Sequence, residues 1–516
     1  MMIIRLIKVL YHIKLLSPVG LYRLVASIYR NGINLMTLLK ITGAVYGDKV
    51  ALVDEDETVS YKQLLSQSEK LAIIFKEKFQ LKAGQKVGFL CKNHASMVKA
   101  IFATSRLGPD IYLLNTEMSK MQLKQLVNQH DFDFLIIDFE LSDLLEDSGY
   151  SKGQLLSTHK DLPAINHLLH GTIDKKSKLQ QSSSGKIMLL TSGTTGKAKE
   201  VAHKPSLFNF LNPFLTLLTR LKLFNYHTAY IATPIFHGYG IAILVSCIAL
   251  GKKVIIRKDF HVKDACQLIR EHNIEVVTVV PLMIHKMLET NASDLTSLRC
   301  IASGGSELNT KLVEEVFHKL GAVIYNLYGT SEAGLNMIAT PQDLQYSTST
   351  IGRKIEGVQL KILDQDKEPV EDGMVGQFCI KNRWSMRNSK NDWIETGDLG
   401  YIDKNGYYFL RGRTDDMVVS AGENVYPIEI EQLLIHHPLV DAVAVIGIHD
   451  EQFGQRLQVF VQPVNAHLTK EALIEWLHPR VARFQMPKDI VFVASMPYTS
   501  LGKLDKKKLR QAAKIS

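Results

Sequence analysis

The sequence predicts an α/β protein with a large N-terminal domain of layered, mostly parallel sheets and a β-rich subdomain, followed by a small α/β C-terminal domain. Its 516 residues exceed the roughly 100–200 residues of one ordinary domain. Short β-rich runs alternate with segments of helical spacing, which is the pattern of layered α/β folds. A composition of 46% hydrophobic and 22% charged residues is that of a globular protein and excludes collagen-like and disordered chains.

Residues 1–43 differ in charge from the rest of the chain. The first 47 residues carry cations and no acidic residue, and a helix would place Arg5, Lys8 and His12 on one stripe. No apolar run reaches the roughly 18–20 residues of a spanning helix, and the interspersed charges do not fit a signal peptide. We expect an amphipathic basic extension that contacts an anionic membrane. The alternative is a helix packed on the protein's own surface.

The large domain is expected over residues 44–412. Val50–Asp54 and Val87–Leu90 are predicted strands, and Tyr61–Lys76 and Met97–Leu107 have helical spacing. The polar stretch Gly171–Lys186 has little to bury and predicts an exposed loop. These segments favour a largely parallel sheet covered by helices.

Shorter strands mark the second half of this domain. Ile324–Asn326 continues the alternation, whereas Val358–Asp364 and Gly376–Lys381 predict a β-rich subdomain. Asp403-Lys-Asn-Gly406 is a strong turn signal between two β-rich runs and predicts a hairpin. The last hundred residues repeat the α/β pattern on a small scale, so a compact C-terminal domain is expected to begin near Arg413.

Net charge and cysteine content indicate which partners and which redox compartment suit the protein. The net charge of +9 suits phosphate-rich or membrane-surface partners, although a soluble basic enzyme has the same balance. The five cysteines are odd in number, widely spaced and without a CxxC pair. A disulfide framework or zinc site is therefore not expected, and a reducing cytoplasm fits best.

A run of glycine and hydroxyl residues, Thr191-Ser-Gly-Thr-Thr-Gly-Lys197, follows the apolar strand Ile187–Leu190. Glycine lets the backbone approach a phosphate chain, while N–H groups and hydroxyls donate to its oxygens. The run is not a Walker A loop, because its glycines are too close and Ala198 stands where Ser or Thr should follow the lysine. By itself the run suits a nucleotide site and a flexible surface loop equally well.

Five further motifs follow in order. They are Tyr328-Gly-Thr-Ser-Glu332, Trp393-Ile-Glu-Thr-Gly-Asp398, Gly412-Arg-Thr-Asp-Asp416, Gly422-Glu-Asn-Val-Tyr-Pro427 and Pro497-Tyr-Thr-Ser-Leu-Gly-Lys503. From about Val45 to Leu509 the set resembles the acyl-adenylate-forming superfamily of AMP-binding enzymes, and most of all the bacterial fatty acyl-CoA synthetases. The resemblance implies that ATP and Mg²⁺ activate a carboxylic acid as acyl-AMP, which then acylates coenzyme A.

The resemblance also implies a nucleotide site. Asp398 would take both ribose hydroxyls with help from Arg413, and Tyr328 would lie flat on the adenine, whose edge the Ser303–Ser306 loop approaches. Glu332 and Thr191 would hold Mg²⁺, a hard cation that prefers oxygen ligands. The ATP-binding residues implied are Thr191, Ser192, Gly193, Thr194, Thr195, Gly196, Lys199, Gly304, Gly305, Ser306, Asn326, Tyr328, Gly329, Thr330, Ser331, Asp398 and Arg413.

Catalytic roles are implied for Lys503, Glu332 and His237. Lys503 would bridge the substrate carboxylate and the α-phosphate, because their mutual repulsion must be neutralised during attack. His237, in Thr233-Pro-Ile-Phe-His237, would sit near the acyl carboxylate or serve only as a packed wall residue.

A domain rotation is implied as well. Residues 417–516 would form a mobile domain that turns about a hinge at 413–416, with Asp415 at the pivot. The rotation would present Ala421, Gly422 and Glu423 to CoA after adenylation.

One departure and several alternatives remain open. Ala198-Lys199-Glu200 replaces the usual Pro-Lys-Gly, which keeps open a non-catalytic nucleotide-binding module. The sequence Gly422–Pro427 favours CoA over a carrier protein as acceptor. A medium- or long-chain fatty acid is the leading substrate, and an aryl or short-chain acid is the alternative, since the fold does not fix the acid. No nucleic-acid partner is expected, and the location expected is the cytoplasm, at the inner face of the membrane.

Overall fold

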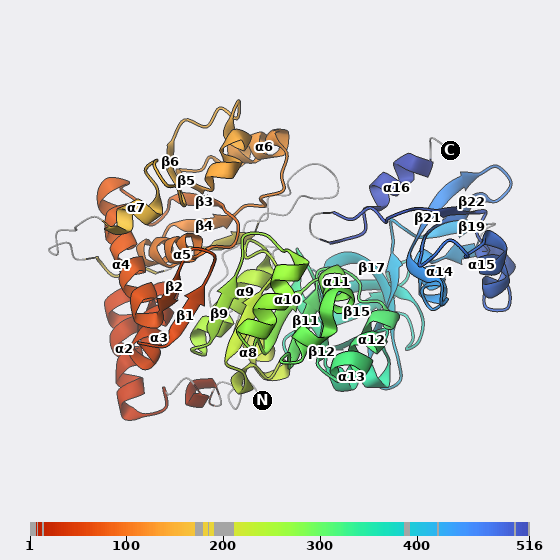
Figure 1. Cartoon of the computed structure of the whole chain (residues 1–516), viewed down its shortest axis with the longest axis horizontal. Helices are drawn as coiled ribbons and strands as arrows, with labels where there is room; N and C mark the ends of the chain where they lie inside the picture. The colour runs from red at the N-terminus through yellow and green to blue at the C-terminus, as the bar shows by residue number, and fades with distance from the viewer. Residues whose placement is uncertain are drawn as a thin grey trace. The chain divides into compact units, whose positions relative to one another are not determined.

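The computed structural model describes residues 7, 9–12, 15–170, 179–183, 185–189, 211–385, 393–420, 423–499 and 502–513. The chain divides into two units, and Figure 1 labels their helices and strands. The first consists mainly of Met1–Val279 and Thr290–Ile301, and the second of Val280–Glu289, Ala302–Ser385 and the chain from Ser389 onward. This division does not test the predicted boundaries at residues 43, 412 and 416, which stay predictions.

The strands of the first unit form two mostly parallel sets. One is a five-stranded sheet of order β6-β5-β3-β4-β7, and every neighbouring pair in it is parallel. Its strands are β3 (Lys86–Leu90), β4 (Asp110–Leu113), β5 (Phe134–Ile137), β6 (Gly153–Leu156) and β7 (Ile187–Leu189). The predicted mostly parallel α/β architecture is confirmed.

The other β-system has the strand order β10-β8-β9-β1-β2. Its pairs are parallel, except that β1 and β2 form an antiparallel pair at the edge. Its strands are β1 (Val50–Val53), β2 (Thr58–Ser60), β8 (Thr228–Ile231), β9 (Lys253–Ile256) and β10 (Val276–Val279). All four residues of β10 are buried, as expected of a parallel strand covered on both faces.

Helices cover these strands. They are α2 (Pro18–Asn31), α3 (Leu35–Tyr46), α4 (Tyr61–Lys78), α5 (Ala95–Leu107), α6 (Lys120–His130), α7 (Ile165–His170), α8 (Leu211–Arg220), α9 (Gly238–Ala249) and α10 (Val262–Glu271). The predicted helices at 61–76 and 97–107 are confirmed. Helix α4 begins at a capping box between Ser60 and Gln63, and α5 begins two residues early because His94 caps it. All of α5 is buried.

The N-terminal extension is described only in part, because most of residues 3–14 lie outside the described residues. Pro18 occupies the first turn of α2, where its missing N–H costs nothing, and Ser17 caps the helix through its hydroxyl. Val19, Tyr22, Val25 and Tyr29 are 59–79% exposed on α2. Among the described residues, no helix is both long and apolar enough to span a bilayer.

The second unit contains an antiparallel sheet of order β15-β16-β17-β18-β14-β13-β12. The hairpin predicted at residues 403–406 joins β17 to β18 and is confirmed. The strands are β12 (Ile324–Thr330), β13 (Gly334–Ala339), β14 (Thr350–Lys354), β15 (Gln359–Leu363), β16 (Gly376–Lys381), β17 (Ile394–Ile402) and β18 (Tyr408–Arg413). The helices are α11 (Pro281–Asn291), α12 (Thr310–Leu320) and α13 (Pro341–Tyr346). Strand β11 (Cys300–Gly304) ends in the Ser303–Ser306 loop.

A smaller α/β fold completes this unit. Its sheet has the order β20-β19-β22-β21, with β23 paired parallel to β22. The elements are β19 (Val418–Ser420), β20 (Glu423–Val425), α14 (Pro427–Ile435), β21 (Val440–Asp450), β22 (Gly454–Pro463), α15 (Lys470–Leu477), β23 (Asp489–Phe492) and α16 (Lys506–Ala513). Its core packs α14 and α15 against the sheet, with Ile430, Leu473 and Val459 fully buried. The predicted small α/β domain is confirmed.

Candidate active site

A half-buried carboxylate lies at the centre of the candidate site in the second unit. Asp398, on β17, is 13% exposed at its side chain. Its Oδ2 accepts a hydrogen bond from the Tyr328 hydroxyl at 2.6 Å, and its Oδ1 accepts one from Nη1 of Arg413 at 3.0 Å. Burial raises the pKa of Asp398, and the two donors only partly oppose this shift. The structure therefore brings together three of the predicted nucleotide-binding residues.

Arg413 joins this carboxylate to the predicted hinge. Its Nε donates to Oδ1 of Asp415 at 2.9 Å while Nη1 holds Asp398, so one guanidinium serves two carboxylates. Gly397 makes this approach possible, because it adopts φ +76° and a Cβ there would lie 3.0 Å from Nη2 of Arg413. The residues after β18 form a turn in which Thr414 donates its N–H to Gly397.

Two glycines bring a second pair of loops together around Val280. Gly305 (φ +87°) and Gly502 (φ +70°) both adopt left-handed conformations that favour glycine. A Cβ at Gly502 would lie 2.7 Å from one methyl of Val280, and a Cβ at Gly305 would lie 3.6 Å from the other. The Ser303–Ser306 loop and the loop carrying Lys503 thus flank one side chain.

Lys503 is exposed and lies within electrostatic range of the Asp398 site. Its pKa is lowered by desolvation and then by the positive charge of Arg413, while Asp398 acts in the opposite direction. The charges of Arg413 and Asp398 therefore both act on the Lys503 ammonium, and its assignment to the α-phosphate stays a prediction.

Other predicted residues of the second unit lie on β12 and in the turn that follows it. Asn326 is buried on β12 and donates from Nδ2 to Thr350 O at 3.5 Å. Gly329 approaches Gly334 so closely that a Cβ would lie 2.5 Å from its carbonyl oxygen. Half-buried Glu332 lies in the turn between β12 and β13, where the Thr330 hydroxyl accepts the Ala333 N–H at 3.0 Å.

The magnesium assignment stays a prediction. A carboxylate oxygen of Glu332 suits Mg²⁺ chemically. Thr191 and the rest of the predicted phosphate loop, Ser192 to Lys199, lie outside the described residues, as do Ala421 and Gly422. Glu423 is described and is exposed on β20.

His237 belongs to the first unit. It is half-buried at the N-cap of α9, and its ring packs against Phe236 at a centroid distance of 4.5 Å. The main-chain N–H of His237 donates to Pro234 O at 3.2 Å, which closes a tight turn before the helix.

Sequence reasoning missed Val280, Gly397 and Asn93. Val280 precedes Pro281, a helix-start signal that could have drawn attention to it. Gly397 stands inside a motif, but its role depends on a cross-strand approach that is set only by folding. Asn93 donates to Thr233 O and accepts from Ile235 N–H, and no sequence signal linked it to that loop.

Together, these elements define an α/β protein with a large N-terminal domain and a smaller C-terminal domain. The chain belongs to the AMP-binding enzymes: the family's main domain matches residues 39–388, and its C-terminal domain matches residues 429–503.

Several known proteins are similar to this chain. The 2-succinylbenzoate–CoA ligase of Bacillus subtilis (strain 168) is 27% identical over 487 residues, which cover 90% of this chain and 96% of that protein. Amide bond synthetase McbA from Marinactinospora thermotolerans superposes with a TM-score of 0.81 at 22% identity, covering 93% and 99%. O-succinylbenzoate CoA synthetase (MenE) from Bacillus subtilis, solved with its acyl-adenylate intermediate, gives 0.78 at 24% identity, covering 92% and 97%. The two structural matches establish the shared fold.

Proposed function

We propose that this protein is an AMP-forming acid–thiol ligase that uses ATP, Mg²⁺ and coenzyme A. The observation that carries the proposal is the half-buried Asp398 carboxylate, held between Tyr328 and Arg413 with the Lys503 ammonium in electrostatic range. A two-oxygen acceptor of this kind suits paired ribose hydroxyls. A cation beside it suits the reaction of two anions.

The reaction proceeds in two displacements. A carboxylate oxygen of the acid attacks the α-phosphorus of ATP, and pyrophosphate leaves. The sulfur of CoA then attacks the acyl carbon, AMP leaves, and the thiol proton is lost to solvent. Lys503 acts in the first displacement by neutralising the approaching charges, and His237 lies beside the acyl carboxylate. Glu332, with Thr191, would hold Mg²⁺, which neutralises charge on the departing pyrophosphate.

The acid proposed is an aromatic carboxylic acid. Support comes from the curated relatives, which are named for 2-succinylbenzoate and align along 90% of this chain. This reverses the preference drawn from sequence, which put fatty acids first. The CoA-ligase form of the Gly422–Pro427 motif supports CoA over a carrier protein as the acceptor.

A fatty acid taken from a membrane is the second candidate, and one observation favours it. Val19, Tyr22, Val25 and Tyr29 form an exposed stripe on α2, flanked by exposed Arg23 and Arg30. An apolar, aromatic and cationic face on one helix is typical of contact with anionic lipid at the bilayer interface. This would hold the enzyme at the inner face of the cytoplasmic membrane.

The test is CoA-thioester formation with 2-succinylbenzoate, benzoate, and fatty acids of graded length, alongside acid-dependent pyrophosphate exchange into ATP. Highest kcat/KM with an aromatic acid supports the first proposal, and highest kcat/KM with a long-chain acid supports the second. Absence of exchange with every acid would leave only a nucleotide-binding module. Exchange without thioester formation would point to another acyl acceptor, such as a carrier protein.

A further inference from the structure

The loop Thr233–His237 is held in place by the side-chain amide of Asn93, which lies between β3 and α5 of the first unit. Asn93 follows β3, and its Nδ2 donates to Thr233 O at 3.1 Å. Its Oδ1 accepts from Ile235 N–H at 2.7 Å. Asn93 and both loop residues are buried, so water does not compete for either hydrogen bond. One side chain therefore fixes the main chain at two points, four and two residues before His237.

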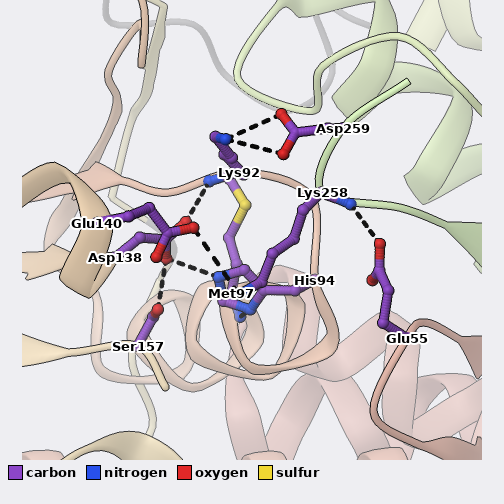
Figure 2. Close-up of polar contacts among 9 residues, drawn as sticks. All are labelled: Glu55, Lys92, His94, Met97, Asp138, Glu140, Ser157, Lys258 and Asp259. Carbon is purple, nitrogen blue, oxygen red and sulfur yellow. Dashed lines mark hydrogen bonds and ion pairs between the residues drawn. The ribbon is translucent and has the colours of Figure 1, made fainter. Parts of the chain in front are cut away.

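Asn93 is in turn bracketed by Asp138, at the end of β5. Oδ2 of Asp138 accepts from Lys92 N–H at 2.8 Å, and Oδ1 pairs with Nε2 of His94 at 2.8 Å (Figure 2). The Ser157 hydroxyl donates to Oδ1 as well. Residues on both sides of Asn93 are thus tied to one buried carboxylate. Burial opposes the charge on Asp138, but the hydrogen bonds that it accepts from His94, Ser157 and the Lys92 main chain hold the pKa of Asp138 below its usual value.

His94 has a defined hydrogen-bonding role. Its Nδ1 accepts Met97 N–H at 3.1 Å as the N-cap of α5, so Nε2 carries the proton that is donated to Asp138. Cys91, His94 and Asp138 lie close enough to surround one metal ion. However, both ring nitrogens of His94 already have partners, and burial followed by the Asp138 charge raises the pKa of the Cys91 thiol well above its usual value. The cluster is better described as a hydrogen-bonded support than as a metal site.

The opposite side of the loop is also fixed. The Thr233 and Thr278 hydroxyls pair at 2.9 Å, and Thr278 is buried on β10. Gly240 lies so close to the loop that a Cβ would be 2.2 Å from Pro234 O. The loop is therefore confined between three strand ends and the first turn of α9, with His237 at its exit.

We propose that Asn93 is a positioning residue for the acid substrate: it sets the loop that presents His237, and Asp138 with His94 sets Asn93. The inference rests on the proposed function, in which His237 lies beside the acyl carboxylate. Asn93 itself makes no contact with the reacting atoms in this scheme, and its effect passes through the loop main chain.

The test compares the full-length Asn93→Ala variant with wild type. The kcat/KM for the acid in adenylation should fall roughly 10–100-fold, because small misplacements of reacting groups have effects of this size. The KM for ATP should stay within about twofold of wild type. Hydrogen–deuterium exchange should accelerate in peptides covering residues 233–241. Ser157→Ala, a milder change in the same network, should give a smaller loss in the same acid-only direction.

Asn166→Ala is the matched control. Its amide also holds main chain at two points, accepting from His159 N–H at 3.3 Å and donating to His159 O at 2.8 Å, in a loop that does not carry His237. This variant should lose some thermal stability and keep its acid kinetics. Equal kinetic losses in Asn93→Ala and Asn166→Ala would overturn the proposal, because the effect would then be general destabilisation.

The His237→Ala variant tests the proposed role of His237 separately from the positioning role of Asn93. If this variant keeps wild-type acid kinetics, the proposed role of His237 fails, whatever Asn93 does. If it loses acid kinetics and Asn93→Ala does not, or if Asn93→Ala impairs ATP and acid alike, the positioning role fails. A double variant no worse than His237→Ala supports action through the histidine. Stoichiometric zinc in purified protein that is lost on Cys91→Ser would replace the support with a metal site.

Discussion

The hydroxyl of Tyr328 donates to Oδ2 of Asp398 at 2.6 Å; the tyrosine is buried and the carboxylate is half-buried. Tyr328 thus does more than provide the flat ring that sequence reasoning assigned to it. Its hydroxyl is one of two donors that partly offset the cost of ionising a half-buried carboxylate, and the other is Arg413.

Tyr328→Phe should move the acidic limb of the pH profile of kcat/KM for ATP to higher pH. The ionised form of Asp398 is needed to accept ribose hydroxyls, and its pKa, already raised by burial, rises further when a donor is lost. The contribution of Asp398 to the free energy of unfolding decreases, whereas nucleotide binding improves, as pH rises. Because the folded pKa lies above the unfolded one, the contribution of this group is fully present below the unfolded pKa and declines as pH rises through the folded pKa. Pre-steady-state adenylation rates measured against pH check the shift, and an unmoved limb would contradict it.

Lys503→Ala should slow adenylation by about 10²–10³ and nearly spare thioester formation from presynthesised acyl-AMP and CoA. The reason is that Lys503 supplies charge only while the carboxylate attacks phosphorus. Lys507→Ala, at another exposed lysine nearby, is the control and should change neither step. Equal losses in both steps would show that Lys503 is structural or that the small domain does not rotate.

Glu332→Gln should lower the adenylation rate and raise the Mg²⁺ concentration needed for half-maximal rate. A neutral amide is a poorer ligand for a hard cation than a carboxylate. A magnesium titration at saturating ATP measures this effect, with Glu451→Gln, at an exposed glutamate that has no assigned role, as the control. If the titration curve is unchanged, the metal ligand lies elsewhere.

Replacing Tyr22, Val25 and Tyr29 together with serine should reduce binding to anionic vesicles and leave turnover of water-soluble acids intact. These side chains are 65–79% exposed, so their loss removes little packing. This variant is preferable to deleting residues 1–43, because Leu35, Met36 and Leu39 of α3 are buried in the first unit. Co-sedimentation at low and high salt is the measurement, with Met121→Ser on α6 as the control. Equal sedimentation of variant and wild type would show that α2 does not bind lipid.

The fold class and many individual elements could be predicted from the sequence. Apolar periodicity identified the helix that begins at Tyr61 and the strands around Val50 and Val87. The buried face of a helix or strand requires apolar residues at the spacing of that element, so the spacing can be read in the sequence. Turn chemistry identified the hairpin at Asp403–Gly406 for the same local reason.

The contacts that build the site could not be predicted in this way. Asn93 and Thr233 are 140 residues apart, and Val280 lies between two glycines that belong to distant loops. Such contacts depend on strand order and loop approach, which leave no period in the chain. The acid substrate could not be assigned from the sequence for a related reason, since the fold does not fix the residues that contact the acid.

The guanidinium of Arg413 is shared by Asp398 and Asp415, and this sharing has a thermodynamic consequence. A ligand that engages Asp398 alters the charge balance felt by Asp415, and a rotation that withdraws Asp415 alters the balance felt by Asp398. Linkage requires the two effects to be equal in free energy. If the small domain turns about residues 413–416 as predicted, nucleotide affinity and the orientation of that domain would be coupled, and measuring either as a function of the other would yield the same coupling constant.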